Sequence, residues 1–487
     1  MTASGDSARP VANREVPALS DALRVLAFGA CGLLVSAKAD GRFPFPDSLP
    51  ETVFQLALLP YTLALCAAVA VFLAAPRLTR ALSPRLPRRL ITIPPLTYGL
   101  GVGLLFAALT LVVLRLETRQ YASFGYALPP RCFAALGLLV TLLVAWLVLS
   151  RRASAQSMLL AAASVYAASQ VASLVYFPLH PGRSDMLPLI AAACRRFCDG
   201  QSPYGLHLLP HAVPLTYLPG TWLAFAPAVC AHLDPRLVHA LGTLAATGLL
   251  YMAAARERRA TVAVLAALFL LMPYLEYRHE LYLGPLWLAL ALLTLCLARG
   301  RALAAGLAMG WACASSQFAW ILLPAFGACV WRTCGARRAA SALAAAAAVA
   351  GVLVAPFALW APEPFFQGVF GHWGQTLNAT TANLSFFIAR ALRIEGLRAV
   401  QWSAWVALTL LLTRRLRSAA GFLSAASVLL GAFVLLNSVV WVYFYLTVFF
   451  LMIASVAAER SHLPETRLAG HVSGASGEES RTFVRRE

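Results

Sequence analysis

Long apolar runs, separated by short polar connections, recur along most of the chain. They lie at residues 52 to 75, 92 to 114, 132 to 150, 157 to 177, 237 to 255, 260 to 275, 281 to 298, 340 to 360, 400 to 413 and 420 to 457. Most approach the roughly 20 apolar residues that a helix needs to cross the hydrocarbon core of a bilayer. A weaker run at 22 to 37 lacks the basic leader and small-residue exit of a signal peptide, so we interpret it as a first span. The pattern predicts an all-α fold, a polytopic bundle of transmembrane helices.

Composition and charge agree with this fold class. Hydrophobic residues make up 60% of the chain and charged residues only 12%, whereas soluble domains carry about 25% charged residues. Basic residues outnumber acidic ones by 39 to 20, a balance that nucleic-acid-binding proteins also show. Here, however, the arginines cluster in short connections between apolar runs, at Arg77 to Arg89, Arg151 and Arg152, Arg256 to Arg259, Arg299 and Arg301, Arg332 to Arg338, and Arg414 to Arg417. This distribution places those connections in the cytoplasm and predicts membrane lipids, not nucleic acid, as partners.

The remaining connections are then expected outside. Two of them, at 178 to 217 and 361 to 399, are long and rich in Pro, Gly, His and aromatic residues, and long loops in compact proteins are usually functional or disordered. We expect both on the same, non-cytoplasmic side, enclosing a polar-lined cavity that opens sideways to lipid. The prolines of the segment 218 to 233 favour a re-entrant segment over a crossing.

A second irregular segment, 302 to 331, lies between two cytoplasmic arginine clusters and must therefore form a hairpin of two short helices, bent near Ser315, Ser316 and Gln317. About thirteen apolar segments result. The predicted organisation is a cytoplasmic tail (1 to 20), N-terminal transmembrane helices (21 to 177), a transmembrane region with the two external loops (178 to 457) and a disordered cytoplasmic tail (458 to 487). The abundance of Ala and Arg, with a single lysine, suggests a bacterial plasma (inner) membrane.

The ten cysteines do not predict a disulfide framework. Most of them, Cys230 included, lie inside apolar runs, where cysteine behaves as a small hydrophobic residue. Cys194 and Cys198 lie in an external loop, but two cysteines four residues apart on a helix fit disulfide geometry poorly.

Several motifs of well-known chemistry are missing from the chain. It contains no G-x-x-x-x-G-K-[ST], H-E-x-x-H, C-x-x-C or acidic D-x-D sequence, which argues against an ATP-driven motor and a metal enzyme. We therefore expect neither a metal nor a cofactor. The polar residues concentrate in the first long external loop, in the segments Arg183-Ser-Asp185-Met-Leu-Pro, Asp199-Gly-Gln-Ser-Pro203-Tyr204-Gly205 and Pro214-Leu-Thr-Tyr217-Leu-Pro219-Gly220.

This order of features resembles the GT-C glycosyltransferases, and among them the bacterial polyprenyl-phosphate mannosyltransferases. The shared features are an acidic residue in a large external loop, a short helix on the membrane, and then G-x-x-P-Y-G and Y-x-P. The segment 303 to 326, with Ser316, Gln317 and Pro324, and the segment Pro356-Phe357-Ala-Leu-Trp360 are also similar. The resemblance covers roughly residues 180 to 457. It departs from that branch around Glu276-Tyr-Arg278-His279-Glu280, and in the several spans that precede the acidic loop.

The resemblance implies an inverting, metal-independent transfer of a mannose-like hexose or a pentose. The donor would be a polyprenyl-phosphate sugar, and the acceptor a lipid or glycan at the outer face. Such a transfer requires a carboxylate base near the acceptor and cations near the phosphate leaving group. Asp185 is the candidate base, but Ser184 or Asp185, followed by Pro188, can also be the N-cap and first turn of a loop helix. Asp199 and Glu363 are the alternative bases.

Other polar residues of the outer side are candidates for binding substrate. Arg183, Arg278 and His279 can meet the lipid phosphate, although the last two also fit interfacial snorkelling or pairing with Glu276 and Glu280. His372 and Gln375 can line the same cleft or be merely exposed. The remaining candidates, Tyr204, Tyr217 and Gln317, each have a structural alternative: interfacial anchoring for the tyrosines, helix packing for the glutamine.

Two other readings stay open. A transporter or flippase of lipid-linked glycans would place ionisable residues at mid-membrane depth, whereas most charges here lie in connections or at predicted helix ends. A catalytically inactive scaffold with the same fold is the third reading.

Overall fold

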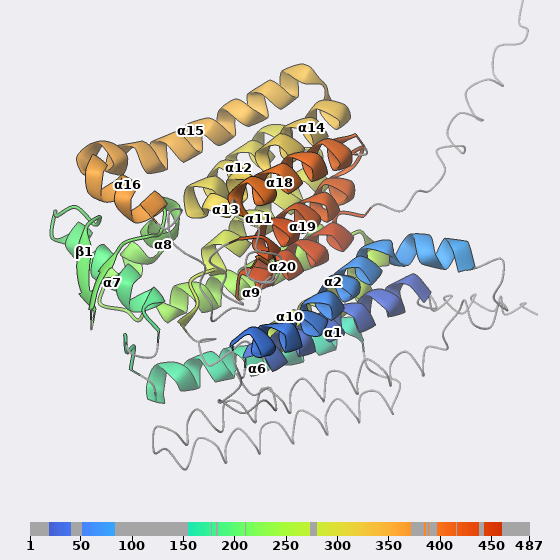
Figure 1. The fold of residues 1–487 in the computed structure, drawn as a ribbon, viewed down its shortest axis with the longest axis horizontal. Helices are drawn as coiled ribbons and strands as arrows, with labels where there is room; N and C mark the ends of the chain where they lie inside the picture. The colour runs from blue at the N-terminus through green and yellow to red at the C-terminus, as the bar shows by residue number, and fades with distance from the viewer. Residues whose placement is uncertain are drawn as a thin grey trace, which may run out of the picture.

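The computed structural model describes residues 19–39, 51–82, 154–176, 178–181, 184–209, 211–272, 280–371, 384–385, 388, 397–414, 416–437 and 443–459. These residues form helices and one short hairpin (Figure 1). The elements are α1 (Leu19–Ala39), α2 (Glu51–Leu82), α6 (Ala155–Tyr176), α7 (Met186–Cys198), β1 (Leu206–Leu209), β2 (His211–Pro214), α8 (Pro219–Cys230), α9 (Arg236–Ala253), η1 (Arg256–Arg258), α10 (Arg259–Leu270), α11 (Gly284–Ala298), α12 (Ala302–Ser315), α13 (Gln317–Trp320), α14 (Leu323–Cys334), α15 (Ala336–Trp360), α16 (Pro362–Gly371), α18 (Leu397–Thr413), α19 (Ala419–Leu435) and α20 (Phe444–Ala457).

The helical character expected from the apolar runs is confirmed for the described residues. Three of their helices contain a stretch long and apolar enough to cross a membrane, at Thr62–Thr79, Ala155–Tyr176 and Ala336–Trp360. Helix α15 exposes large apolar side chains, among them Val352 and Leu359 at 73% and 81% of their area. Such a surface is stable in contact with lipid and costly in water. The number of spans and the GT-C fold stay predictions.

The helices of the bundle lie roughly side by side, with α20 and α10 near its centre (Figure 1). Every residue of α20 from Tyr445 onward is buried, and the same holds for α10 from Thr261 onward. Helices that are apolar on all sides are expected in the interior of a large protein or in a membrane. Small residues bring neighbouring helices close, as where Gly242 of α9 meets Gly284 of α11.

The predicted hairpin at 302 to 331 is confirmed. Helix α12 ends at Ser315, Ser316 adopts an extended conformation (φ −150°, ψ 130°), and α13 begins at Gln317. The indole Nε1 of Trp320 donates to the Cys313 carbonyl across the break at 2.7 Å. This side-chain hydrogen bond therefore links the two helices where the backbone hydrogen bonds of the helix are interrupted.

The segment 218 to 233 does not cross the bundle. It forms α8, a helix of 12 residues that is about 18 Å long, against about 30 Å for a hydrocarbon core. Figure 1 shows α8 beside α7, at the end of the bundle where the hairpin and α16 also lie. We call α7, the β1–β2 hairpin, α8 and α16 the cap; they share a hydrophobic core around Trp222 and Phe365.

The expectation for the cysteines was wrong at one pair. A disulfide joins Cys198, the last residue of α7, to Cys230, the last residue of α8, with Cα atoms 6.0 Å apart. The physical reason is that α8 packs along α7, which brings the last residues of the two helices together. Cys194, the other candidate of the external loop, is a free, buried thiol.

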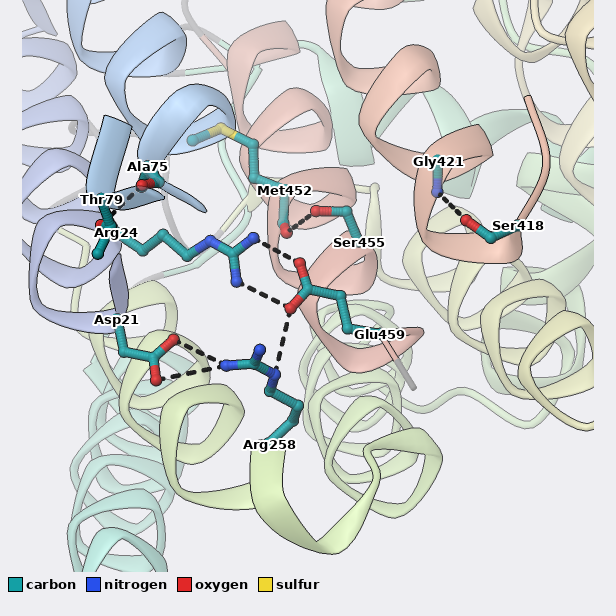
Figure 2. Close-up of polar contacts among 10 residues, drawn as sticks. All are labelled: Asp21, Arg24, Ala75, Thr79, Arg258, Ser418, Gly421, Met452, Ser455 and Glu459. Atoms are coloured by element: carbon teal, nitrogen blue, oxygen red, sulfur yellow. Dashed lines mark hydrogen bonds and ion pairs between the residues drawn. The ribbon is translucent and has the colours of Figure 1, made fainter. Parts of the chain in front are cut away.

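At the opposite end of the bundle, four charged side chains hold the N-terminal helix to the rest (Figure 2). Arg24 of α1 donates through both terminal nitrogens to the Glu459 carboxylate that follows α20. Arg258 of η1 pairs with Asp21 at 3.1 Å and with Glu459 at 3.2 Å. Two cations and two anions thus neutralise one another where α1 begins, η1 turns and α20 ends. The arginine distribution predicts the start of α1, η1 and the end of α20 on the same side of the membrane. The ion pairs join these three segments.

Candidate functional site

Asp185 lies directly before α7 and its carboxylate is free of any capping role. The residue has helical torsion angles (φ −86°, ψ −12°) and its side chain makes no capping hydrogen bond. Its backbone carbonyl accepts from the Leu189 N–H at 2.8 Å, while the Ser184 hydroxyl accepts from the Met186 N–H at 3.4 Å. Asp185 is also exposed. Asp185 thus occupies the N-cap position of α7, but its side chain does not cap the helix and its carboxylate is left exposed.

Three tyrosines from distant parts of the chain meet near Asp185. The rings of Tyr217 and Tyr282 lie 4.5 Å apart, and those of Tyr282 and Tyr443 lie 6.1 Å apart. Tyr217 precedes α8, Tyr282 precedes α11 and Tyr443 precedes α20, so each lies just outside a helix. We call them the tyrosine cluster. Only Tyr217 was a sequence candidate.

The electrostatics of the cluster link it to Asp185. Burial raises the pKa of all three phenols, and the negative charge of Asp185 raises each of them further. The three phenols also raise one another's pKa, since Tyr282 acts on Tyr217 and both act on Tyr443. The phenols consequently stay protonated at neutral pH, and each can donate a hydrogen bond.

A hollow between the helices begins at this cluster. It is small, about 30 Å³, and is lined by Tyr282, Leu283, Leu286, Leu290, Ser316, Phe318, Ala319, Leu322, Leu430, Val434, Phe444 and Thr447. Its hydroxyl groups come from Tyr282, Ser316 and Thr447, residues at the cap-side ends of their helices or just before them. The Thr447 hydroxyl accepts from the Trp287 indole at 3.2 Å. This hollow is mainly apolar and its walls are helices. The polar-lined cavity expected between the two external loops stays a prediction, because much of the second loop lies outside the described residues.

Gln317 joins the two predicted external loops. Its amide nitrogen donates to the Thr216 carbonyl at 3.2 Å and to the Val369 carbonyl at 3.3 Å. Thr216 belongs to the first loop and Val369 to α16, in the second. Of the two alternatives for Gln317, the structure thus shows a packing role, in which it fixes the backbone next to Tyr217.

Tyr204 has a similar supporting role. Its side chain is 2% exposed, and its ring packs against Phe365 with centroids 4.8 Å apart. Its hydroxyl donates to the Tyr217 carbonyl at 2.9 Å and accepts from the Trp222 indole at 3.3 Å. A ring packed in this way neither stacks on a sugar nor anchors at a membrane interface. It holds the segment that carries Tyr217.

The remaining candidates divide into two groups. Arg183, Arg278, His279, His372 and Gln375 lie outside the described residues. Asp199 is exposed but follows the other end of α7 from Asp185, and Glu363 accepts from Gln367 at 3.0 Å. Within the described part of the chain, no group of three or more His, Cys, Asp or Glu residues could hold a metal ion.

Sequence reasoning missed Tyr282 and Tyr443. Each follows a polar or aromatic connection on the side predicted to be external, and that position was the available signal. Comparison with known proteins adds no assignment: no protein-family model, no curated protein and no solved structure matches the chain.

Proposed function

We propose that the chain is an integral membrane glycosyltransferase that moves a sugar from a polyprenyl-phosphate donor to a lipid or glycan acceptor at the outer face of a bacterial plasma membrane. The observation that carries the proposal is the exposed Asp185 carboxylate, which makes no capping hydrogen bond. Its negative charge acts on the tyrosine cluster, which lies beside an apolar hollow. The carboxylate suits a general base, and the protonated phenols suit hydrogen bonding to a substrate oxygen.

In the proposed reaction, the Asp185 carboxylate takes the proton of the acceptor hydroxyl as its oxygen attacks the anomeric carbon. The bond from that carbon to the phosphate oxygen breaks on the opposite face, and the lipid phosphate leaves with the electron pair. A single displacement inverts the configuration at the sugar. Arg278 and His279 are the proposed cations for the leaving phosphate, and the protonated Tyr282 phenol is a proposed hydrogen-bond donor to it.

The direct test is to incubate membranes containing the protein with radiolabelled polyprenyl-phosphate mannose, other hexoses and pentoses. Label should move to a new lipid or glycan, and membranes without the protein should show no transfer. Movement of intact donor between leaflets without transfer would instead establish a flippase. The absence of both activities would contradict the proposal.

Tyr282→Phe is expected to slow transfer by roughly 10- to 100-fold, which is the effect of removing one hydrogen bond to a charged group. The variant keeps the ring and its packing against Tyr217 but loses the phenolic hydroxyl. Tyr251→Phe is the matched control. Tyr251 lies near the last residue of α9, beside Arg259, whereas Tyr282 lies near the first turn of that helix. Steady-state transfer rates of both variants check this prediction, and equal rates would remove Tyr282 from the site.

A further inference from the structure

The first turn of α8 is fixed to the end of α12. A Cβ atom on Gly220 would lie 2.6 Å from the Ala314 backbone carbon, so the two helices touch through their backbones. The Thr221 hydroxyl donates to the Ser315 carbonyl at the same place. Because α12 belongs to the bundle, these contacts fix α8, and with it the cap, to the bundle.

Helix α7 is in turn fixed along α8. The Cys194 thiol donates to the Trp222 carbonyl at 3.3 Å, and the Phe197 and Trp222 rings lie 5.3 Å apart. At the ends of the two helices, the disulfide joins Cys198 to Cys230 across 32 positions of sequence. Figure 1 shows α7 and α8 side by side in the cap. A covalent bond thus closes the connection from the bundle to α7.

Asp185 lies at the opposite end of α7 from this bond. The helix has 13 residues and is about 20 Å long. For a rigid helix of that length, a tilt of about 3° at Cys198 moves Asp185 by about 1 Å. A displacement of that size can cost a reaction about 100-fold, because proton transfer needs the base within hydrogen-bond reach.

We propose that the Cys198–Cys230 disulfide is a positioning element for Asp185, and that it makes the site complete only where the cap faces an oxidising compartment. The functional part of this inference rests on the glycosyltransferase proposed above. Forming the bond from two thiols releases two protons and passes two electrons to a disulfide-donating oxidant of that compartment. A dithiol reverses the step: it supplies two electrons and two protons, both cysteines become thiols, and the dithiol becomes a disulfide. Both cysteines are exposed, so each reagent can reach them.

The test compares the wild-type protein with a Cys198→Ser/Cys230→Ser double variant and a Cys334→Ser control, all in native membranes. Cys334 is a free, half-buried thiol and the last residue of α14, remote from the cap. Dithiothreitol should lower kcat of the wild type and of the control by roughly 10- to 100-fold, with little change in KM, and oxidised glutathione should restore it. The double variant should have the low kcat from the start and should not respond to dithiothreitol.

A second readout does not need activity. An impermeant maleimide, applied to intact cells, should label Cys198 and Cys230 only after reduction. Labelling without reduction would overturn the disulfide, and a failure to label after reduction would overturn the external placement of the cap. A double variant with wild-type kcat would overturn the positioning role. If no wild-type sample transfers sugar, the proposed function fails, whereas the labelling result still decides whether the bridge exists and where it faces. Should the double variant not assemble, reduction of assembled wild-type protein gives the same comparison.

Discussion

An Asp185→Asn variant is expected to lose sugar transfer by about 100-fold or more, in the range usual for removal of a general base. The substitution keeps the shape of the side chain and removes its basicity. Because the carboxylate is exposed and makes no capping hydrogen bond, the melting temperature should barely change. For the same reason, Asp185→Ala should be nearly as stable as the wild type, whereas a residue whose side chain makes a capping hydrogen bond would lose about 1 kcal/mol on the same change.

Asp199→Asn is the matched control for this experiment. Asp199 is also an exposed aspartate beside α7, but it follows the last turn, where Asp185 precedes the first. Turnover of both variants, measured with the same radiolabelled donor and at equal protein content, distinguishes the two carboxylates. Loss of activity in Asp199→Asn, together with normal activity in Asp185→Asn, would transfer the role of base to Asp199.

The sequence predicted those features of the fold that depend on local pattern. Apolar runs predicted the helices, and the arginine-rich connections on both sides of 302 to 331 required a bend near Ser316, which the structure has. Prolines and the same charge distribution favoured a re-entrant segment over a crossing at 218 to 233. These arguments succeed because the bilayer imposes one length and one charge rule on every segment.

Features that depend on tertiary contact could not be predicted in this way. Cys230 lies in an apolar run, and only the pairing of α7 with α8 shows that it ends beside Cys198. Tyr282 and Tyr443 are 161 positions apart in sequence and meet only because α11 and α20 lie in one bundle. Tyr204 looked like a surface aromatic until its packing against Phe365 was visible. Residue type alone did not separate substrate contact from support.

The second large effect is expected from Gly284→Ala, at the crossing of α9 and α11. A Cβ atom there would lie 2.4 Å from the His239 carbonyl oxygen and 2.9 Å from its Cα, and neither backbone atom can move without moving α9. The Gly284 N–H also donates to His239 Nδ1 at 3.0 Å, a bond that would break if the helices separated. Overpacking of this kind costs about 1–3 kcal/mol, and more where the backbone resists. Transfer should fall as well, since Tyr282 lies two residues before Gly284.

Gly248→Ala is the control, and it should have the opposite sign. Gly248 lies on α9 itself, and a Cβ atom there would meet nothing within 4 Å. Replacing a glycine inside a helix by alanine then stabilises by about 0.5–1 kcal/mol, because alanine restricts the unfolded chain and adds no clash. Thermal unfolding in detergent can be monitored by the loss of monodisperse protein. The apparent melting temperature of Gly284→Ala should be below that of the wild type, and that of Gly248→Ala should be equal to it or higher. Equal melting temperatures for the two variants would show that α9 and α11 do not touch at Gly284.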